Sequence, residues 1–326
     1  MNQTVLLTGA FGNIGAHVLD HLLAAGHRVV CLDLPGPKTR AVAARYGDRI
    51  DVIWGNLCDA DLQRRALAEV DAVIHMAAII PPLSESNESL ATEVNLGATQ
   101  LMVRLMEEMP RAKRLVFASS MTLGGKEQHR RSPPMRTDEP PSPCDHYGRT
   151  KARCEELLRA SRLQWTILRI AACPATDQKA GSSEESALIF DASIGGRVEL
   201  VHADDAGLAF ANAVACDAAI GKTLFVGGGQ RCQMTALDFY NRMLAAMGLG
   251  PLDPKAFRPG APYFFGDWLD TTESQALLQF QRHSAEDYFA ELGRNFGWKR
   301  HLLRLIAPLA NREIQKRSPW LKKADQ

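Results

Sequence analysis

Short apolar runs alternate with longer amphipathic segments over the first two thirds of the chain. The short runs are rich in aliphatic and β-branched residues and predict strands at 4–8, 28–32, 51–54, 72–75, 114–118 and 164–170. Apolar residues at helical spacing predict helices at 17–25, from 60 onward, at 87–108, 147–161 and 206–216. This alternation is typical of an α/β protein with a Rossmann-type, doubly wound parallel sheet.

The length and the order of these segments predict two structural parts. A chain of 326 residues fits two domains of ordinary size. We expect a Rossmann domain over 1–171, with 196–229 returning to it. A smaller, mostly C-terminal substrate-binding lobe is expected from 172–195 and 230–326.

A glycine-rich turn joins the first predicted strand to the first predicted helix. Its spacing is GxxGxxG, with Gly9 allowing a tight turn, Gly12 an approach of pyrophosphate and Gly15 close packing of the helix. Asp33 ends the second strand, where a carboxylate accepts the ribose hydroxyls of NAD and repels the 2′-phosphate of NADP. We therefore expect NAD rather than NADP. The predicted cofactor contacts of this turn are Gly9, Phe11, Gly12, Asn13, Ile14 and Gly15.

Tyr147 and Lys151 stand four residues apart, on one face of a predicted helix. An ammonium one turn away favours the phenolate and lowers the pKa of the tyrosine. Tyr147 is then suited to exchange a proton with a substrate hydroxyl while a nicotinamide exchanges a hydride. Lys151 is suited to donate to the nicotinamide ribose. Ser120, at the end of the fifth strand, is placed to hydrogen-bond the same substrate oxygen.

The motifs TGAFGNIG, GNLCD, HMAA, FASS, YGRTK and LVHADD occur in this order. Together with Asp33 and Asn95, they resemble the extended short-chain dehydrogenase/reductases, the NAD-dependent epimerase/dehydratase family. The resemblance implies Ser120, Tyr147 and Lys151 as the catalytic set, and a homodimer. It also implies further cofactor contacts at Asn56, Leu57, Ala77, Ala78 and Asn95.

Several positions depart from the patterns of that family. The turn at Ser120 and Met121 has no carboxylate for an elimination, and Ala172 and Val198 replace the usual sugar-nucleotide asparagine and arginine. The run 79–83 predicts an apolar wall, or alternatively core packing. We expect substrate contacts from Ile80, Ser120, Met121 and Tyr147.

These departures leave three functions open. The first is an NAD-dependent oxidoreductase acting on a small secondary alcohol or carbonyl substrate. The second is an NAD-dependent epimerase of a sugar or sugar nucleotide. The third is a non-catalytic NAD-binding sensor.

Composition narrows the class of protein further. The seven cysteines are scattered without a CxxC pair, which predicts free thiols in the cytoplasm rather than disulfides or a zinc site. His75 and His202 lack partners at metal-ligand spacing, so we expect structural histidines and no metal. A net charge of +1 argues against nucleic-acid binding.

The net charge of the whole chain is close to zero, but its C-terminal segment is basic. Residues 294–326 hold nine Lys/Arg against two Asp/Glu, so the other residues are net negative. Leu302, Leu305, Ile306 and Leu309 fall on one helical stripe that we expect Pro308 to limit. We favour a final helix packed on the acidic body. The alternative is weak contact of 300–326 with an anionic membrane surface or an acidic partner.

Overall fold

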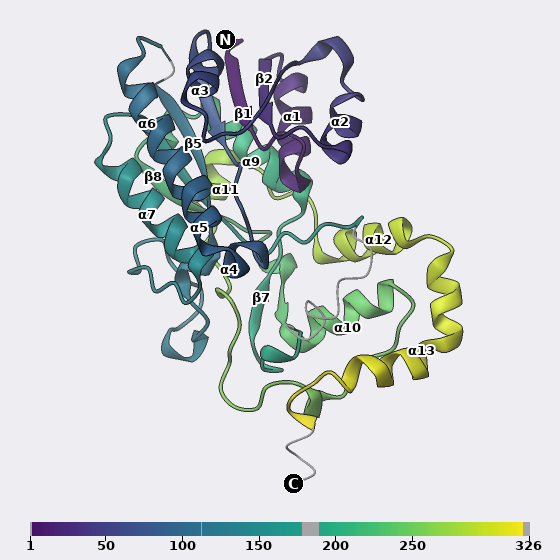
Figure 1. Cartoon of the computed structure of the whole chain (residues 1–326). Coiled ribbons are helices and arrows are strands. Elements are labelled where there is room, and N and C mark those ends of the chain that lie inside the picture. Colours follow the sequence, from purple (N-terminus) through teal and green to yellow (C-terminus); the bar gives the residue numbers. More distant parts are fainter. Residues whose placement is uncertain (1, 112, 178–188, 322–326) are drawn as a thin grey trace.

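The computed structural model describes residues 2–111, 113–177 and 189–321, and its centre is a parallel sheet (Figure 1). Within these residues the sheet has seven strands in the order β3-β2-β1-β4-β5-β6-β8. Every neighbouring pair is parallel. The strands are β1 (Thr4–Thr8), β2 (Arg28–Asp33), β3 (Asp51–Trp54), β4 (Ala72–His75), β5 (Arg114–Ser120), β6 (Gln164–Ile170) and β8 (Lys222–Val226). The predicted doubly wound α/β class is confirmed.

Helices cover both faces of the sheet because its strands are apolar on both sides. On β1, Val5 and Leu7 point into one apolar layer and Leu6 into the other. The first layer is completed by α1 (Asn13–Ala24), α9 (Ala203–Ala215) and α11 (Thr272–Leu278). The second is completed by α3 (Ala60–Leu67), α6 (Ala98–Glu108) and α7 (His146–Ala160). A further helix, α2 (Pro37–Ala43), follows β2.

The segment predicted as one helix over 87–108 is helical from Glu88 to Glu108, with a π-helical turn between two α-helical parts. Two short helices, α4 (Leu83–Ser86) and α5 (Glu88–Ala91), come before a π-helical turn over Thr92–Gly97, and α6 follows directly. The π-helical turn contains Asn95. Such turns are rare and occur often at functional sites.

A smaller lobe lies beside the carboxyl ends of the strands (Figure 1). Its two-stranded antiparallel sheet pairs β7 (Arg197–Glu199) with β9 (Gln233–Thr235). Its helices are α10 (Ala236–Ala246), α12 (Ala285–Phe296) and α13 (Lys299–Gln315). Because β7 lies in the lobe and α11 packs on the sheet, the chain passes between the two parts more often than the predicted ranges imply.

Helix α13 extends from Lys299 to Gln315 and continues through Pro308. The prediction that Pro308 limits this helix was wrong. Proline removes one backbone hydrogen bond, but the flanking turns remain, and Pro308 lies on an exposed face where its ring is accommodated. Within the described residues, no helix combines the length and apolar character needed to cross a membrane.

Candidate functional site

The glycine turn between β1 and α1 leaves almost no room for side chains. Gly9 has a φ of +69°, and a Cβ atom on it would stand 2.9 Å from the backbone nitrogen of Ala77, after β4. A Cβ atom on Gly15 would stand 2.1 Å from the carbonyl oxygen of Gly9. Gly12 is the N-cap of α1, which starts at Asn13 and not at the predicted residue 17. The free N–H groups of this helix end thus begin inside the turn, as anion binding requires.

Asp33 is held at the end of β2, next to this turn. Its Oδ2 accepts a hydrogen bond from the Phe11 amide at 3.0 Å, and its Oδ1 accepts one from the Leu34 amide at 2.8 Å. Burial raises the pKa of the Asp33 carboxyl above its ordinary value, and the two amide bonds oppose that rise. The Phe11 ring lies 5.4 Å from the Trp54 ring, centre to centre. The carboxylate is therefore fixed beside the glycine turn, and the residues present fit the adenosine end of a dinucleotide.

Hydrogen bonds join the ends of β1 and β4. The Thr8 hydroxyl oxygen accepts from the amides of Met76 and Ala77, at 3.1 and 3.2 Å. It also pairs with His75 Nδ1 at 2.7 Å, while His75 Nε2 pairs with Thr99 at 2.9 Å. Both ring nitrogens of His75 thus have protein partners, as expected for a structural histidine. The network positions Ala77 beside the glycine turn, and Ala78 is the next residue of the chain.

Three other predicted cofactor residues have local backbone or packing roles. The Asn95 amide bonds both the N–H and the C=O of Ile79, at 2.7 and 2.9 Å, and also the Thr150 hydroxyl at 3.2 Å. It thereby ties the segment after β4 to α7. Asn56 Oδ1 accepts from the Cys58 amide at 3.0 Å, and Leu57 is buried.

The three predicted catalytic residues come from the end of β5 and the start of α7. Ser120 is the last residue of β5, and its Oγ accepts from the amide and the hydroxyl of Thr122, at 3.2 and 3.0 Å. Tyr147 lies in the first turn of α7. Beside it, a Cβ atom on Gly148 would lie 3.5 Å from the Thr122 hydroxyl oxygen, so this helix turn contacts the Ser120 turn.

Lys151 points toward the strand rather than toward the phenol. Its Nζ donates to the carbonyl oxygen of Ala118 at 2.7 Å and lies 4.7 Å from the centre of the Phe117 ring and 5.8 Å from that of Tyr147. Burial lowers the pKa of Lys151 to about 8. Burial also raises the pKa of Tyr147, and Asp145 adds to the rise. The predicted lowering of the Tyr147 pKa is therefore wrong for this structure, because desolvation outweighs the lysine.

The start of α7 has a carboxylate partner that the sequence analysis missed. Glu85, in α4, accepts from the amides of His146 and Tyr147 at 2.9 and 3.0 Å. Partial burial opposes ionisation, but these bonds hold the pKa of Glu85 below its usual range. No motif marks Glu85, because the contact joins positions 61 residues apart. It fixes the helix turn that carries Tyr147.

The predicted substrate contacts differ in exposure. Ile80 is 60% exposed, so the run after β4 is an open apolar surface rather than core packing. Met121 is buried, and its sulfur is 2.9 Å from where a Cβ atom on Gly266 would lie. Its side chain therefore packs at the junction with the lobe.

Two basic side chains near this junction were also missed. Lys126 and Arg258 both bind Asp191, at 3.1 and 3.3 Å. Lys126 lies 3.9 Å from the centre of the Phe265 ring. Burial raises the pKa of Asp145, the N-cap of α7, and the positive charge of Lys126 opposes that rise. By contrast, Arg197 is committed to a short ion pair with Asp267 at 2.5 Å. Lys126 and Arg258 thus come from positions that no family motif marks.

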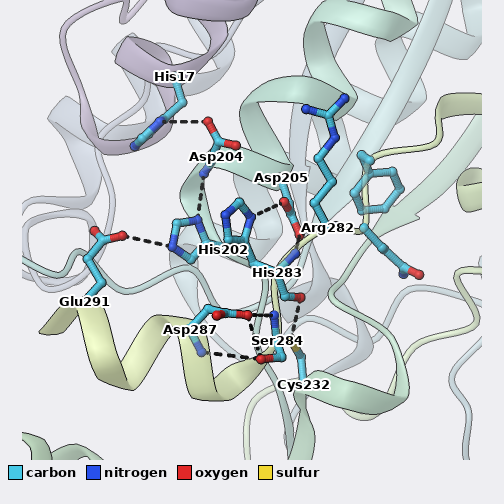
Figure 2. A network of polar contacts seen from close by, with 12 residues as sticks. His17, His202, Asp204, Asp205, Cys232, Arg282, His283, Ser284, Asp287 and Glu291 are labelled. Atoms are coloured by element: carbon cyan, nitrogen blue, oxygen red, sulfur yellow. Dashed lines mark hydrogen bonds and ion pairs between the residues drawn. The ribbon is translucent and has the colours of Figure 1, made fainter.

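A polar network joins α1, α9 and α12 (Figure 2). Asp204 accepts from His17 and His21 at 3.4 and 3.0 Å. His202 bonds the Asp204 amide and Glu291, and its ring stacks on His283 at 4.1 Å. Both ring nitrogens of His202 have protein partners, which agrees with the expected structural role. The network fixes the lobe against the helix that begins at the glycine turn.

The fold and the glycine turn define a Rossmann-type dinucleotide-binding protein. Residues 5–176 match the model of the NAD dependent epimerase/dehydratase family. The chain belongs to this family, as its motifs predicted.

Curated relatives match between half and two thirds of this chain. The chain is 33% identical over 183 residues to UDP-glucose 4-epimerase 4 of Oryza sativa subsp. japonica, covering 51% of this chain and 48% of the relative. It is 28% identical over 205 residues to D-erythronate dehydrogenase of Cupriavidus necator, covering 59% and 61%. The chain thus matches about half the length of the first of these relatives and less than two thirds of the second.

Solved structures match almost the whole fold. A dTDP-glucose 4,6-dehydratase double mutant from Streptomyces venezuelae, with NAD and DAU bound, has a TM-score of 0.75 at 24% identity, covering 91% of this chain and 98% of that one. UDP-glucuronic acid 4-epimerase from Bacillus cereus, in complex with UDP-glucuronic acid and NAD, has a TM-score of 0.73 at 21% identity, covering 92% and 99%. At these identities the likeness shows the fold.

Proposed function

We propose that this protein is an NAD-dependent epimerase of a sugar or sugar nucleotide. The observation that carries the proposal is the contact of the Tyr147 turn with the Ser120 turn, beside a glycine turn and Asp33 that fit NAD. The relatives named UDP-glucose 4-epimerase support this reading. They do not support the small secondary alcohol that we expected first.

When bound, NAD would supply the acceptor for a hydride from a substrate carbinol and, once reduced, the donor of that hydride to the opposite face of the resulting carbonyl. Asp33 and the amides at the start of α1 are the groups that hold the cofactor. Ser120 donates a hydrogen bond to the reacting oxygen, and Tyr147 takes and returns its proton. Because burial raises the pKa of Tyr147, the phenol is a proton donor as it stands. Its pKa has to fall when ligands bind for it to accept the proton.

A second function is a net dehydrogenase of a sugar acid. The absent family arginine, with Val198 in its place, and the commitment of Arg197 to Asp267 favour a substrate smaller than a nucleotide diphosphate. Lys126 and Arg258 share the single carboxylate of Asp191, which leaves one positive charge of the pair for a substrate carboxylate. One of the relatives is a D-erythronate dehydrogenase.

Product analysis separates the two functions. The purified full-length protein is incubated with NAD and either UDP-glucose or D-erythronate, and both the isomeric product and NADH are measured. An epimerase forms the isomer without accumulating NADH, whereas a dehydrogenase forms NADH in proportion to the substrate consumed.

Tyr147→Phe tests the site itself. Loss of the acid/base hydroxyl is expected to lower kcat/KM about 100-fold or more. Tyr46→Phe is the matched control, since the Tyr46 hydroxyl bonds Asp20 on the outer side of α1. Full turnover by the Tyr147 variant would refute the assignment. NAD binding without turnover of either substrate would favour the non-catalytic sensor.

A further inference from the structure

Helix α13 carries an apolar stripe that none of the described residues covers. Consecutive helical residues are rotated by about 100°, which places the stripe residues within an arc of roughly 100°. These side chains are 50% to 79% exposed: Trp298 just before the helix, then Leu302, Leu305, Ile306 and Leu309. Large apolar side chains gathered in this way on a surface mark an interaction site.

The opposite face of α13 already has its packing partners. Asn311 is buried and donates to the Pro251 carbonyl at 3.0 Å. Ile314 packs against a cluster of lobe residues that contains Leu252 and Phe257. At the start of the helix, a Cβ atom on Gly248 would lie 2.1 Å from the Arg300 carbonyl oxygen. The helix is therefore anchored to the lobe (Figure 1), and by helical rotation the exposed stripe lies on the opposite side of the helix.

Basic residues border the stripe. The segment 299–317 holds six Lys/Arg against one acidic residue, Glu313. By helical rotation, Lys299 lies beside Ile306 on one rim, and Arg312 lies beside Leu305 on the other. All the Lys and Arg side chains of this segment are exposed. An apolar stripe with cationic rims is complementary to a layer that has an anionic surface and an apolar interior.

We propose that α13 binds to the surface of an anionic lipid bilayer. Its apolar stripe enters the boundary between headgroups and acyl chains, and its basic rims contact the headgroups. Pairing of two copies through the stripe would bring two strongly basic rims together, which like-charge repulsion disfavours. Because the anchored face is the opposite one, membrane binding requires neither unfolding nor release of the helix.

Sedimentation of the full-length protein with vesicles tests the proposal. Vesicles of phosphatidylcholine with about 30% phosphatidylserine are compared with vesicles of phosphatidylcholine alone. The protein is expected to bind the anionic vesicles at least about tenfold more strongly, with binding weakened by high salt. The tryptophan fluorescence of the protein is expected to shift to the blue on binding, because Trp298 enters the bilayer surface. Trp298→Phe is expected to remove this contribution to the blue shift.

Leu305→Glu is expected to reduce the affinity for vesicles at least about tenfold, because it places a carboxylate in the apolar stripe. Leu34→Glu is the matched control, since Leu34 is a 57% exposed leucine in the nucleotide domain. Both positions are on the surface, and circular dichroism checks that the variants remain folded. Equal binding to neutral and anionic vesicles, or none to either, would overturn the proposal. So would a dimer of the wild type that Leu305→Glu dissociates while vesicle binding is absent.

Discussion

Helices α1 and α13 carry the same kind of apolar stripe in opposite surroundings. In α1, Val18, Leu19 and Leu22 have no exposed surface. In α13, Leu305 is 79% exposed and Leu309 is 68% exposed. The pattern along the sequence thus shows that a helix has an apolar face but does not show what covers it.

The difference comes from the partner helix and from charge. Helix α9 covers α1, and Gly207 permits a close approach, since a Cβ atom there would lie 2.6 Å from the His17 Cβ atom. Helix α1 contains no Lys or Arg, whereas α13 and its flanks are strongly basic. A cationic rim is costly to bury in a protein core and favourable at an anionic surface.

The largest expected difference is between two leucine truncations. Leu19→Ala is expected to lower the free energy of unfolding by about 2–5 kcal/mol, because it leaves a cavity in a packed layer. Leu305→Ala is expected to change it by less than about 0.5 kcal/mol, because that side chain is mostly in water. Urea unfolding of both variants measures the difference. Similar losses in both would mean that the stripe of α13 is covered in solution.

A second test changes the approach of α9 to α1. Gly207→Ala is expected to cost about 1–3 kcal/mol of unfolding free energy, since the new methyl group meets the backbone between His17 and Val18. Gly195→Ala is the control, because a Cβ atom there would have no neighbour within 4 Å. The same denaturation experiment applies. An unchanged midpoint for Gly207→Ala would show that the two helices separate easily.

The smallest expected effect concerns the ion pair between these helices. The hydrogen bond to Asp204 raises the pKa of His17 above 6.5. The stability that protonated His17 adds to the fold is therefore fully present below about pH 6.5, and it is lost as the pH rises through the pKa of His17 in the folded state. The same bond lowers the pKa of Asp204 below 3.8, so its contribution is lost only as the pH falls below about 4. His17→Gln is expected to lower stability most at about pH 5–6. After solvent screening, the loss is expected to be about 0.5 kcal/mol and to shrink toward pH 8.

His301→Gln on α13 is the control for that measurement, because His301 is exposed. Thermal unfolding across this pH range provides the comparison. A constant difference between His17→Gln and wild type at all pH values would indicate lost packing rather than a lost ion pair.

The sequence predicted most of the nucleotide domain because its signals are local. The turn GAFGNIG, Asp33 and the spacing of Tyr147 and Lys151 each depend on residues close together in the chain. The predictions failed where the surroundings decided the outcome. Burial, and not the neighbouring lysine, sets the direction in which the pKa of Tyr147 shifts. Helix α13 continues through Pro308 because the surrounding turns tolerate the proline.

By itself, then, the sequence determined the alternation of strands and helices, the family and the composition of the candidate site, since these follow from periodicity and short motifs. Only the tertiary structure decided that Glu85 holds the start of α7, that Lys126 and Arg258 share Asp191, and that the stripe of α13 faces outward. Such contacts join distant segments. Hydrophobic burial and electrostatic partners depend on which surfaces the folded chain brings together.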